Sequence, residues 1–205
     1  MLQIKTFTFG PFETNCYVVS DEQQILLIDP ACYTDYEQQE LERYLEKLIA
    51  NSQKSIAIIA THGHLDHLWG AKWATDRWNT LVFMHEADIP LARAMQAQYN
   101  LFGIRRPAES FPIEGIQSTE HRIQTDLQII ETPGHTPGSI CLYWPEEKTL
   151  ISGDTLFQNG YGRTDLPGGN MGQLITSLEK LFTLPSDVRV FPGHGAPTTI
   201  GAEKR

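Results

Sequence analysis

The sequence has no long apolar run, few cysteines and no excess of positive charge. No apolar stretch approaches the roughly 20 residues that a membrane-spanning helix needs, so we expect no membrane partner. The 205 residues include 16 Lys and Arg against 25 Asp and Glu, a formal net charge of −9. A general nucleic-acid binder normally carries a basic patch, and we therefore expect no nucleic-acid partner.

Only three cysteines are present, and Cys16, Cys32 and Cys141 lie far apart in the sequence. They form neither a disulfide framework nor a Cys-x-x-Cys metal knuckle. We expect buried, reduced thiols that pack as small apolar groups. The first residues lack the basic region and apolar segment of a signal peptide, so the expected location is the cytoplasm. Nothing in the sequence indicates an oligomeric state.

The chain is long enough for one domain with a sizeable core, and no linker divides it. We therefore predict a single domain over residues 1–205. Short apolar runs predict strands at 4–9, 16–19, 25–28, 56–60, 81–84, 127–131, 140–144, 150–151 and 188–191. Helical periodicity predicts helices over 41–49, near 67–73, over 86–98 and over 174–182. The stretch 98–117 is predicted to be an irregular loop, and the tail 201–205 to be frayed.

The order of these segments indicates an α/β protein with two sheets stacked face to face and helices outside. A doubly wound parallel sheet is the alternative. Runs of neighbouring strands at both ends of the chain count against that alternative.

Three of the seven histidines lie in one short run, directly after the buried strand predicted at 56–60. In an extended segment, residues two apart point the same way, so His62 and His64 can reach one ion. Asp66 and His67 follow where the chain turns, and can face a second point nearby. Imidazole and carboxylate groups suit zinc, iron or manganese. The run therefore predicts a metal site at the end of this strand.

Three further polar residues, His135, Asp154 and His194, each follow a predicted strand and are bracketed by Gly or Pro. Glycine permits tight turns and close backbone approach, and proline fixes a loop. Because this setting recurs three times, we predict all three as metal ligands. We interpret His85 and His121 as ordinary, partly exposed histidines.

The run Thr61–His67 resembles the T-H-x-H-x-D-H motif of the metallo-β-lactamase superfamily, and the later His135, Asp154 and His194 resemble its remaining ligand motifs in order. Segments 12–19 and 27–30 are similar to its opening hairpins. The resemblance implies a four-layer αβ/βα sandwich and two divalent metal ions, zinc first, with iron or manganese as alternatives. It also implies the ligand sets: His62, His64 and His135 for the first ion, Asp66, His67 and His194 for the second, and Asp154 between them.

Within the superfamily, segments 132–139, 153–157 and 160–165 resemble the glyoxalase II group, and in particular short, single-domain bacterial members called hydroxyacylglutathione hydrolase-like. The resemblance implies a small-molecule S-acyl thioester as substrate, cleaved by metal-bound hydroxide. Asp66 would both bind metal and orient the nucleophile. Two-domain glyoxalase II enzymes continue into a helical domain that contacts glutathione. The sequence ends at Arg205, so we expect that domain to be lacking, which leaves the thiol carrier open.

Arg163 and Tyr161 are the candidates for substrate contacts, because both lie in a glycine-rich loop after Asp154. A guanidinium suits carboxylate recognition. The alternatives are a salt bridge between Arg163 and Asp165, and a packing role for Tyr161. Asn15 and Phe12 are weaker candidates.

Three other functions are compatible with the motif. A persulfide dioxygenase would use one iron on His62, His135 and Asp154. A lactonase or β-lactamase would use the same two-metal site on another acyl substrate. A non-enzymatic metal-binding module is the third, and the complete ligand set disfavours it.

Overall fold

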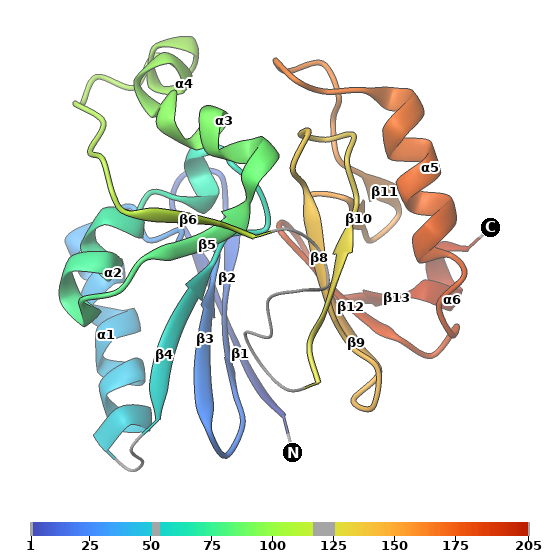
Figure 1. The fold of residues 1–205 in the computed structure, drawn as a ribbon, viewed down its shortest axis with the longest axis horizontal. Helices are drawn as coiled ribbons and strands as arrows, with labels where there is room; N and C mark the ends of the chain where they lie inside the picture. The colour runs from blue at the N-terminus through green and yellow to red at the C-terminus, as the bar shows by residue number, and fades with distance from the viewer. Residues whose placement is uncertain (1, 51–53, 117–125, 205) are drawn as a thin grey trace.

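The computed structural model describes residues 2–50, 54–116 and 126–204. Within these residues the chain forms two main sheets, one in each half of the sequence, as the blue-to-green and yellow-to-red halves of Figure 1 show. The first sheet has the order β1 (Gln3–Phe9), β2 (Thr14–Ser20), β3 (Gln24–Ile28), β4 (Ser55–Ile59), β5 (Val82–His85) and β6 (Ile113–Ile116). The second has the order β13 (Thr198–Thr199), β12 (Arg189–Pro192), β9 (Thr149–Gly153), β8 (Ile140–Trp144) and β7 (Gln128–Glu131). A small ribbon pairs β10 (Leu156–Phe157) with β11 (Gly160–Tyr161).

The central strands of the first sheet are buried on both faces. In β2, all seven residues are buried, which is expected for a strand between two packed layers. Alternate side chains enter different cores: Val18 and Leu27 face the helices, whereas Val19 and Leu26 face the second sheet. This alternation follows from the period of two along a strand.

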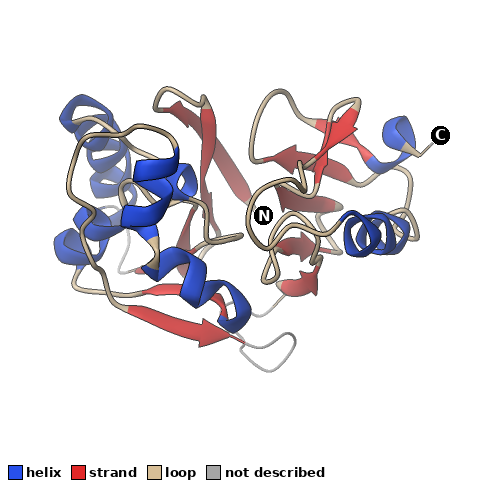
Figure 2. Ribbon diagram, turned by 90° about the horizontal axis from the view of Figure 1, so that it is seen from above, coloured by secondary structure: helices blue, strands red, loops and turns tan. Residues whose placement is uncertain are grey.

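The two sheets pack against each other through an apolar core. Leu26 and Ile59 of the first sheet belong to the same buried cluster as Leu142, Trp144 and Ile151 of the second. Helices α1 (Asp35–Ala50) and α2 (Ala71–Trp78) lie outside the first sheet and α5 (Met171–Leu181) outside the second, and Figure 2 shows strands between these helices. The prediction of two stacked sheets with helices outside is therefore confirmed.

Each outer layer is held by the apolar stripe of a helix. Leu41 and Leu45 of α1 (Asp35–Ala50) are buried in the core of the first half. In the second half, Leu174 and Leu181 of α5 (Met171–Leu181) are buried against the other face of the second sheet. Both stripes agree with the predicted helical periodicity.

The local predictions near the first histidine run were partly wrong. Instead of one helix from about residue 67, a 3-10 turn, η1 (Leu65–His67), precedes α2 (Ala71–Trp78). Gly70 separates them, because its backbone N–H donates to the Pro30 carbonyl at 2.7 Å. A Cβ at this position would lie 2.1 Å from the Cys32 Sγ. Tertiary packing thus interrupts the helix that periodicity predicted.

The region from 86 to 117 is also more divided than predicted. The expected single helix consists of the 3-10 turn η2 (Glu86–Asp88), α3 (Ile89–Arg93) and α4 (Met95–Leu101). Strand β6 lies in the stretch predicted to be an irregular loop, and Gln117 lies outside the described residues. The tail was predicted to be frayed, but α6 (Ile200–Glu203) forms there, with the Thr199 hydroxyl accepting a hydrogen bond from the Ala202 N–H. The two-residue strands were too short for periodicity to detect.

All three cysteines are buried free thiols, as predicted. None of the helices among the described residues is long and apolar enough to span a membrane.

Replacing Leu142 by Ala tests the packing between the sheets. Leu142 is fully buried, and Leu→Ala changes in a core cost about 2–5 kcal/mol of unfolding free energy. We expect such a loss in urea unfolding of Leu142→Ala. The matched control Ile175→Ala removes an exposed side chain on α5 and should change the free energy by less than about 0.5 kcal/mol. Equal effects of the two variants would contradict the assignment of the core.

Candidate metal centre

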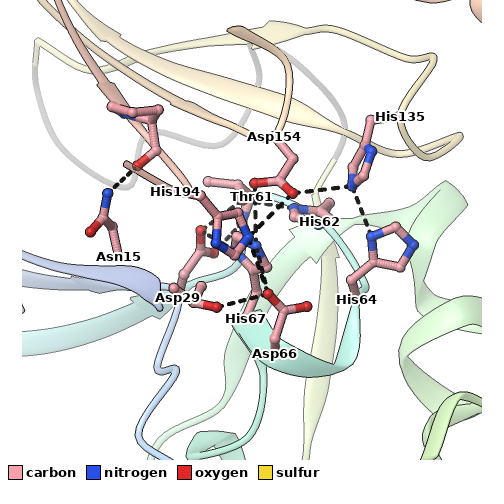
Figure 3. Close-up of polar contacts among 12 residues, drawn as sticks. Asn15, Asp29, Thr61, His62, His64, Asp66, His67, His135, Asp154 and His194 are labelled. Carbon is pink, nitrogen blue, oxygen red and sulfur yellow. Dashed lines mark hydrogen bonds and ion pairs between the residues drawn. The ribbon is translucent and has the colours of Figure 1, made fainter. Parts of the chain in front are cut away.

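The predicted ligands gather where strands of the two sheets end at one edge of the sandwich. His62, His64, Asp66 and His67 follow β4, and the other three follow β7, β9 and β12. Strands β9 and β12 run parallel, and β7 has the same direction because both β7 and β9 pair antiparallel with β8. Their carboxyl ends therefore meet at one edge, the usual place for a site in such sheets. Figure 3 shows these side chains pointing toward one another.

The cluster contains three overlapping groups that could hold a metal ion. In each group, one nitrogen or oxygen from every residue lies within 4.8 Å of the others. The groups are His62, His64 and His135; His62, His67 and Asp154; and Asp66, His67 and His194. The structure thus brings together all seven residues predicted from the sequence.

Asp154 lies between the other ligands. Its Oδ1 is 3.3 Å from the His67 Nε2. Its Oδ2 is 3.4 Å from the His135 Nε2 and 3.5 Å from the His194 Nε2. One carboxylate therefore faces both ends of the cluster, which is the position that a bridging ligand requires.

The polar atoms of the cluster fit a bound cation. Among the described residues, four buried side-chain nitrogen or oxygen atoms lack a hydrogen-bond partner, and three of them are the His62 Nε2, the His67 Nε2 and the Asp154 Oδ1. Buried polar atoms are normally paired, and each exception needs an explanation. Imidazole nitrogens and carboxylate oxygens are also the donors that zinc and iron prefer. A divalent cation would satisfy these atoms together.

The pKa shifts of the clustered side chains also indicate that the carboxylates favour positive charge beside them. Burial opposes protonation of His194, but hydrogen bonds to Asp154 and Asp66 outweigh it and raise the pKa to about 9. Burial tends to raise the pKa of Asp154, yet the charge of His67 and a hydrogen bond from His194 hold it well below its usual range. At His64, burial and the neighbouring His135 lower the pKa to about 3. The carboxylates thus draw cations, while His64 stays in the neutral form that binds metal.

Asp29 orients His67 from behind. Its Oδ2 lies 2.9 Å from the His67 Nδ1 and also accepts a hydrogen bond from the Thr61 hydroxyl at 2.7 Å. The other oxygen accepts from the Thr61 N–H at 2.7 Å. A carboxylate at Nδ1 leaves Nε2 free to bind metal and fixes the ring. The motifs in the sequence predicted no role for Asp29.

Backbone carbonyls orient two other rings in the same way. The His135 Nδ1 lies 2.7 Å from the Arg163 carbonyl, and the His194 Nδ1 lies 3.0 Å from the Phe12 carbonyl. With these nitrogens donating, each Nε2 points into the cluster. The Thr14 hydroxyl donates to the Asp66 Oδ2 at 2.8 Å.

Asp88, a residue with no role predicted from the sequence, joins the two ligand loops. Its Oδ2 accepts hydrogen bonds from the Gly63 N–H at 2.7 Å and the Thr136 hydroxyl at 2.6 Å. Its Oδ1 accepts from the Gly138 N–H at 2.6 Å. A Cβ on Gly138 would lie 2.7–2.8 Å from Asp88 atoms, so this approach requires glycine. The fully buried carboxylate thereby holds the loop after β4 against the loop after β7.

A cavity of about 430 Å³ opens onto the cluster. Both predicted substrate contacts line it, but Arg163 forms a two-point salt bridge with Asp165, at 2.7 Å from each oxygen. This is the alternative considered from the sequence. Tyr161 is 55% exposed at the cavity, so its role there stays a prediction. Phe12 also lines the cavity, whereas the Asn15 amide is buried and donates to the Pro192 and Gly195 carbonyls.

Comparison with known proteins agrees with this geometry. Residues 9–194 match the profile of the Metallo-beta-lactamase superfamily. The chain belongs to this superfamily. It is 34% identical to the probable metallo-hydrolase YqgX of Bacillus subtilis, over 95% of this chain and 91% of the relative. It is 33% identical to the hydroxyacylglutathione hydrolase GloC of Haemophilus influenzae, over 100% of this chain and 96% of the relative.

Solved structures of the superfamily resemble the whole fold. A protein crystallised in a di-iron-bound form, TTHA1623, superposes with a TM-score of 0.83 at 32% identity, covering 98% of this chain and 97% of its own. The B3 metallo-beta-lactamase BLEG-1 gives a TM-score of 0.83 at 31% identity, with 98% and 96% covered. ETHE1 from Myxococcus xanthus gives 0.72 at 27% identity, with 99% and 82% covered.

Asp88→Asn tests whether this superfamily member uses Asp88 as a positioning residue. The amide nitrogen cannot accept, so at least one loop N–H or hydroxyl loses its partner, at a cost of about 1–3 kcal/mol. We expect a lower free energy of unfolding, and metal affinity about 10–100-fold weaker in chelator competition. The control Asp76→Asn changes an exposed carboxylate paired with Lys72 and should affect neither. Unchanged metal affinity in Asp88→Asn would argue against the positioning role.

Proposed function

We propose that this chain is a binuclear metallohydrolase that cleaves an S-acyl thioester, as glyoxalase II-like enzymes do. One observation carries the proposal: the group Asp66, His67 and His194 lies beside the group His62, His64 and His135, with Asp154 facing both. A single-metal site would leave the first of these groups without an ion. The proposed cofactors are two divalent ions, zinc first, with iron or manganese as alternatives.

Divalent ions held by these residues would supply a water nucleophile at neutral pH and would polarise an acyl carbonyl. Asp66 would orient the nucleophile, and its own orientation is held by the hydrogen bond from the Thr14 hydroxyl. Phe12, Phe102 and Phe157 give the cavity wall an apolar surface. These residues therefore prepare the site for attack on an acyl group bound in the cavity.

The acids available in the cavity favour a thioester over an amide. Among the described residues that line it, the only carboxylic acids are Asp66 and Asp154, and both belong to the metal groups. Neither is free to protonate a leaving group. A thiolate leaves without that proton, because its conjugate acid has a pKa of about 8–9. The similarity to the hydroxyacylglutathione hydrolase GloC supports thioester cleavage, and the similarity to the probable metallo-hydrolase YqgX supports hydrolysis in general.

A mono-iron persulfide dioxygenase is the second candidate, with iron on His62, His135 and Asp154. The resemblance to ETHE1 from Myxococcus xanthus keeps this candidate open, and the di-iron form of TTHA1623 adds iron to the metals to test. A lactonase or β-lactamase specificity is the third, and the resemblance to the B3 enzyme BLEG-1 keeps β-lactams in the substrate panel.

The variants His64→Ala and Asp154→Ala test the proposal. Each removes a ligand atom, so we expect bound metal to fall below two ions per chain, and hydrolysis of S-lactoylglutathione to fall at least about 100-fold. Metal content is measured by elemental analysis, and hydrolysis by thiol release. The control His85→Ala removes a histidine outside the cluster and should keep both metals and activity.

The same preparations distinguish the candidates. Two metals per chain with thioester cleavage support the hydrolase. One iron per chain, with oxygen uptake on glutathione persulfide, would replace it with the dioxygenase. Full thioesterase activity after metal removal would contradict both.

A further inference from the structure

A second cavity adjoins the first. It has a volume of about 280 Å³ and lies between the α3–α4 region and residues 166–167. Three residues, His64, Phe102 and Leu166, line both cavities. A substrate bound at the metal centre can therefore extend past His64 into the second cavity.

The wall of the second cavity offers a ligand almost no polar group. Its apolar lining residues are Leu91, Ala94, Ala97, Leu101, Phe102, Leu166 and Pro167. The Gln98 amide is committed within the protein. Its Nε2 donates to the Gly63 carbonyl at 3.0 Å and the Leu91 carbonyl at 2.9 Å, and its Oε1 accepts from the Leu65 N–H at 3.0 Å. Only His64, at the boundary with the metal centre, remains polar.

Exposed apolar side chains surround both cavities. Phe12, Leu101, Phe102 and Tyr161 are 38%, 61%, 38% and 55% exposed, and each lines one or both cavities. The rings of Phe12 and Phe102 meet edge to face at 5.5 Å. Contiguous exposed apolar surface of this kind marks a binding site. The substrate part that lies here should therefore be apolar.

The charges argue against a polyanionic substrate arm in either cavity. Among the described residues that line them, Arg163 is the only Lys or Arg, and both its bonds go to Asp165. The chain also carries a net charge of −9. A free carboxylate of a peptide-like thiol would find no unpaired cation in these walls. Charge complementarity thus agrees with the apolar lining.

We infer that the second cavity is a subsite for an apolar acyl chain, so that the substrates are thioesters of fatty acids rather than of short hydroxy acids. This inference rests on the proposed thioesterase function. We place the acyl group of the thioester in this cavity, and not the thiol, because the thiol carriers of cellular thioesters bear charged or strongly polar groups. Leu101, Ala97 and Phe102 then determine specificity.

Hydrolysis of a chain-length series tests the subsite. The substrates are the acetyl, butyryl, hexanoyl and octanoyl thioesters of N-acetylcysteamine, a small neutral thiol, with the zinc-loaded protein. We expect kcat/KM to rise up to about fourfold for each methylene buried, the equivalent of about 0.8 kcal/mol. The octanoyl thioester should also exceed S-lactoylglutathione.

Two variants should reduce this dependence on chain length. Leu101→Ser removes apolar surface from the subsite, and Ala97→Asp places a charge in it; both side chains are exposed, so the fold should tolerate them. Ile175→Ser is the matched control, because Ile175 is an exposed aliphatic residue on α5 outside both cavities. The control should keep the slope of the unsubstituted protein.

Binding of the product carboxylates separates the subsite from the reaction. Calorimetry with acetate, butyrate, hexanoate and octanoate requires no turnover, and affinity should rise with chain length in the unsubstituted protein and less in Leu101→Ser. If binding shows this dependence but no thioester is hydrolysed, the subsite stands and the proposed function is wrong. If thioesters are hydrolysed with no dependence on chain length, the subsite is wrong. An effect of Leu101→Ser on self-association alone, measured by sedimentation, would make this surface an interface between copies of the chain and overturn the inference.

Discussion

The buried carboxylates at the junction of the two sheets impose the constraint on which the rest of the site depends. Asp66 and Asp154 are about nine-tenths buried, and both face the His67 Nε2, a buried nitrogen that lacks a hydrogen-bond partner. Burying a charge is costly unless it is paired or coordinates a metal. The neighbouring imidazoles compensate this negative charge. Asp29 orients His67 toward the carboxylates, and the carboxylates raise the pKa of His194.

The imidazoles and carboxylates come from both sheets, so they stay close together only if the two sheets keep their relative position. Backbone hydrogen bonds connect the halves directly, from the Ile140 N–H to the Thr61 carbonyl at 2.9 Å and from the Asn15 N–H to the Gly193 carbonyl at 2.7 Å. The Tyr17 hydroxyl adds a bond to the Pro192 carbonyl at 2.5 Å. The Asp88 carboxylate joins the loop after β4 to the loop after β7 by further hydrogen bonds. The apolar core and these bonds together hold ligands from opposite halves within reach of shared ions.

Reaction class and substrate depend on different parts of the molecule. The seven residues of the metal cluster bear on the reaction class, and relatives of this chain are named as hydrolases and as a lactamase. The cavity walls bear on the substrate that binds beside the cluster. They are mainly apolar, and Arg163, the only Lys or Arg among the described residues that line them, is paired with Asp165. Fold and ligands therefore do not by themselves decide the substrate. The assignment of residues 1–205 to one domain and the cytoplasmic location stay predictions.

The sequence alone determined the main strands, the stacked-sheet architecture and the seven residues of the cluster. It could do so because strand periodicity is local, and because each ligand follows a strand within a short Gly- or Pro-containing loop. Only the tertiary structure decided that Asp88 and Asp29 support those ligands and that Gly70 interrupts a helix. The apolar cavity beside His64 was equally invisible, since its walls come from α3, α4 and residues 166–167. These features depend on contacts between segments far apart in the chain, and no pattern along the sequence records such contacts.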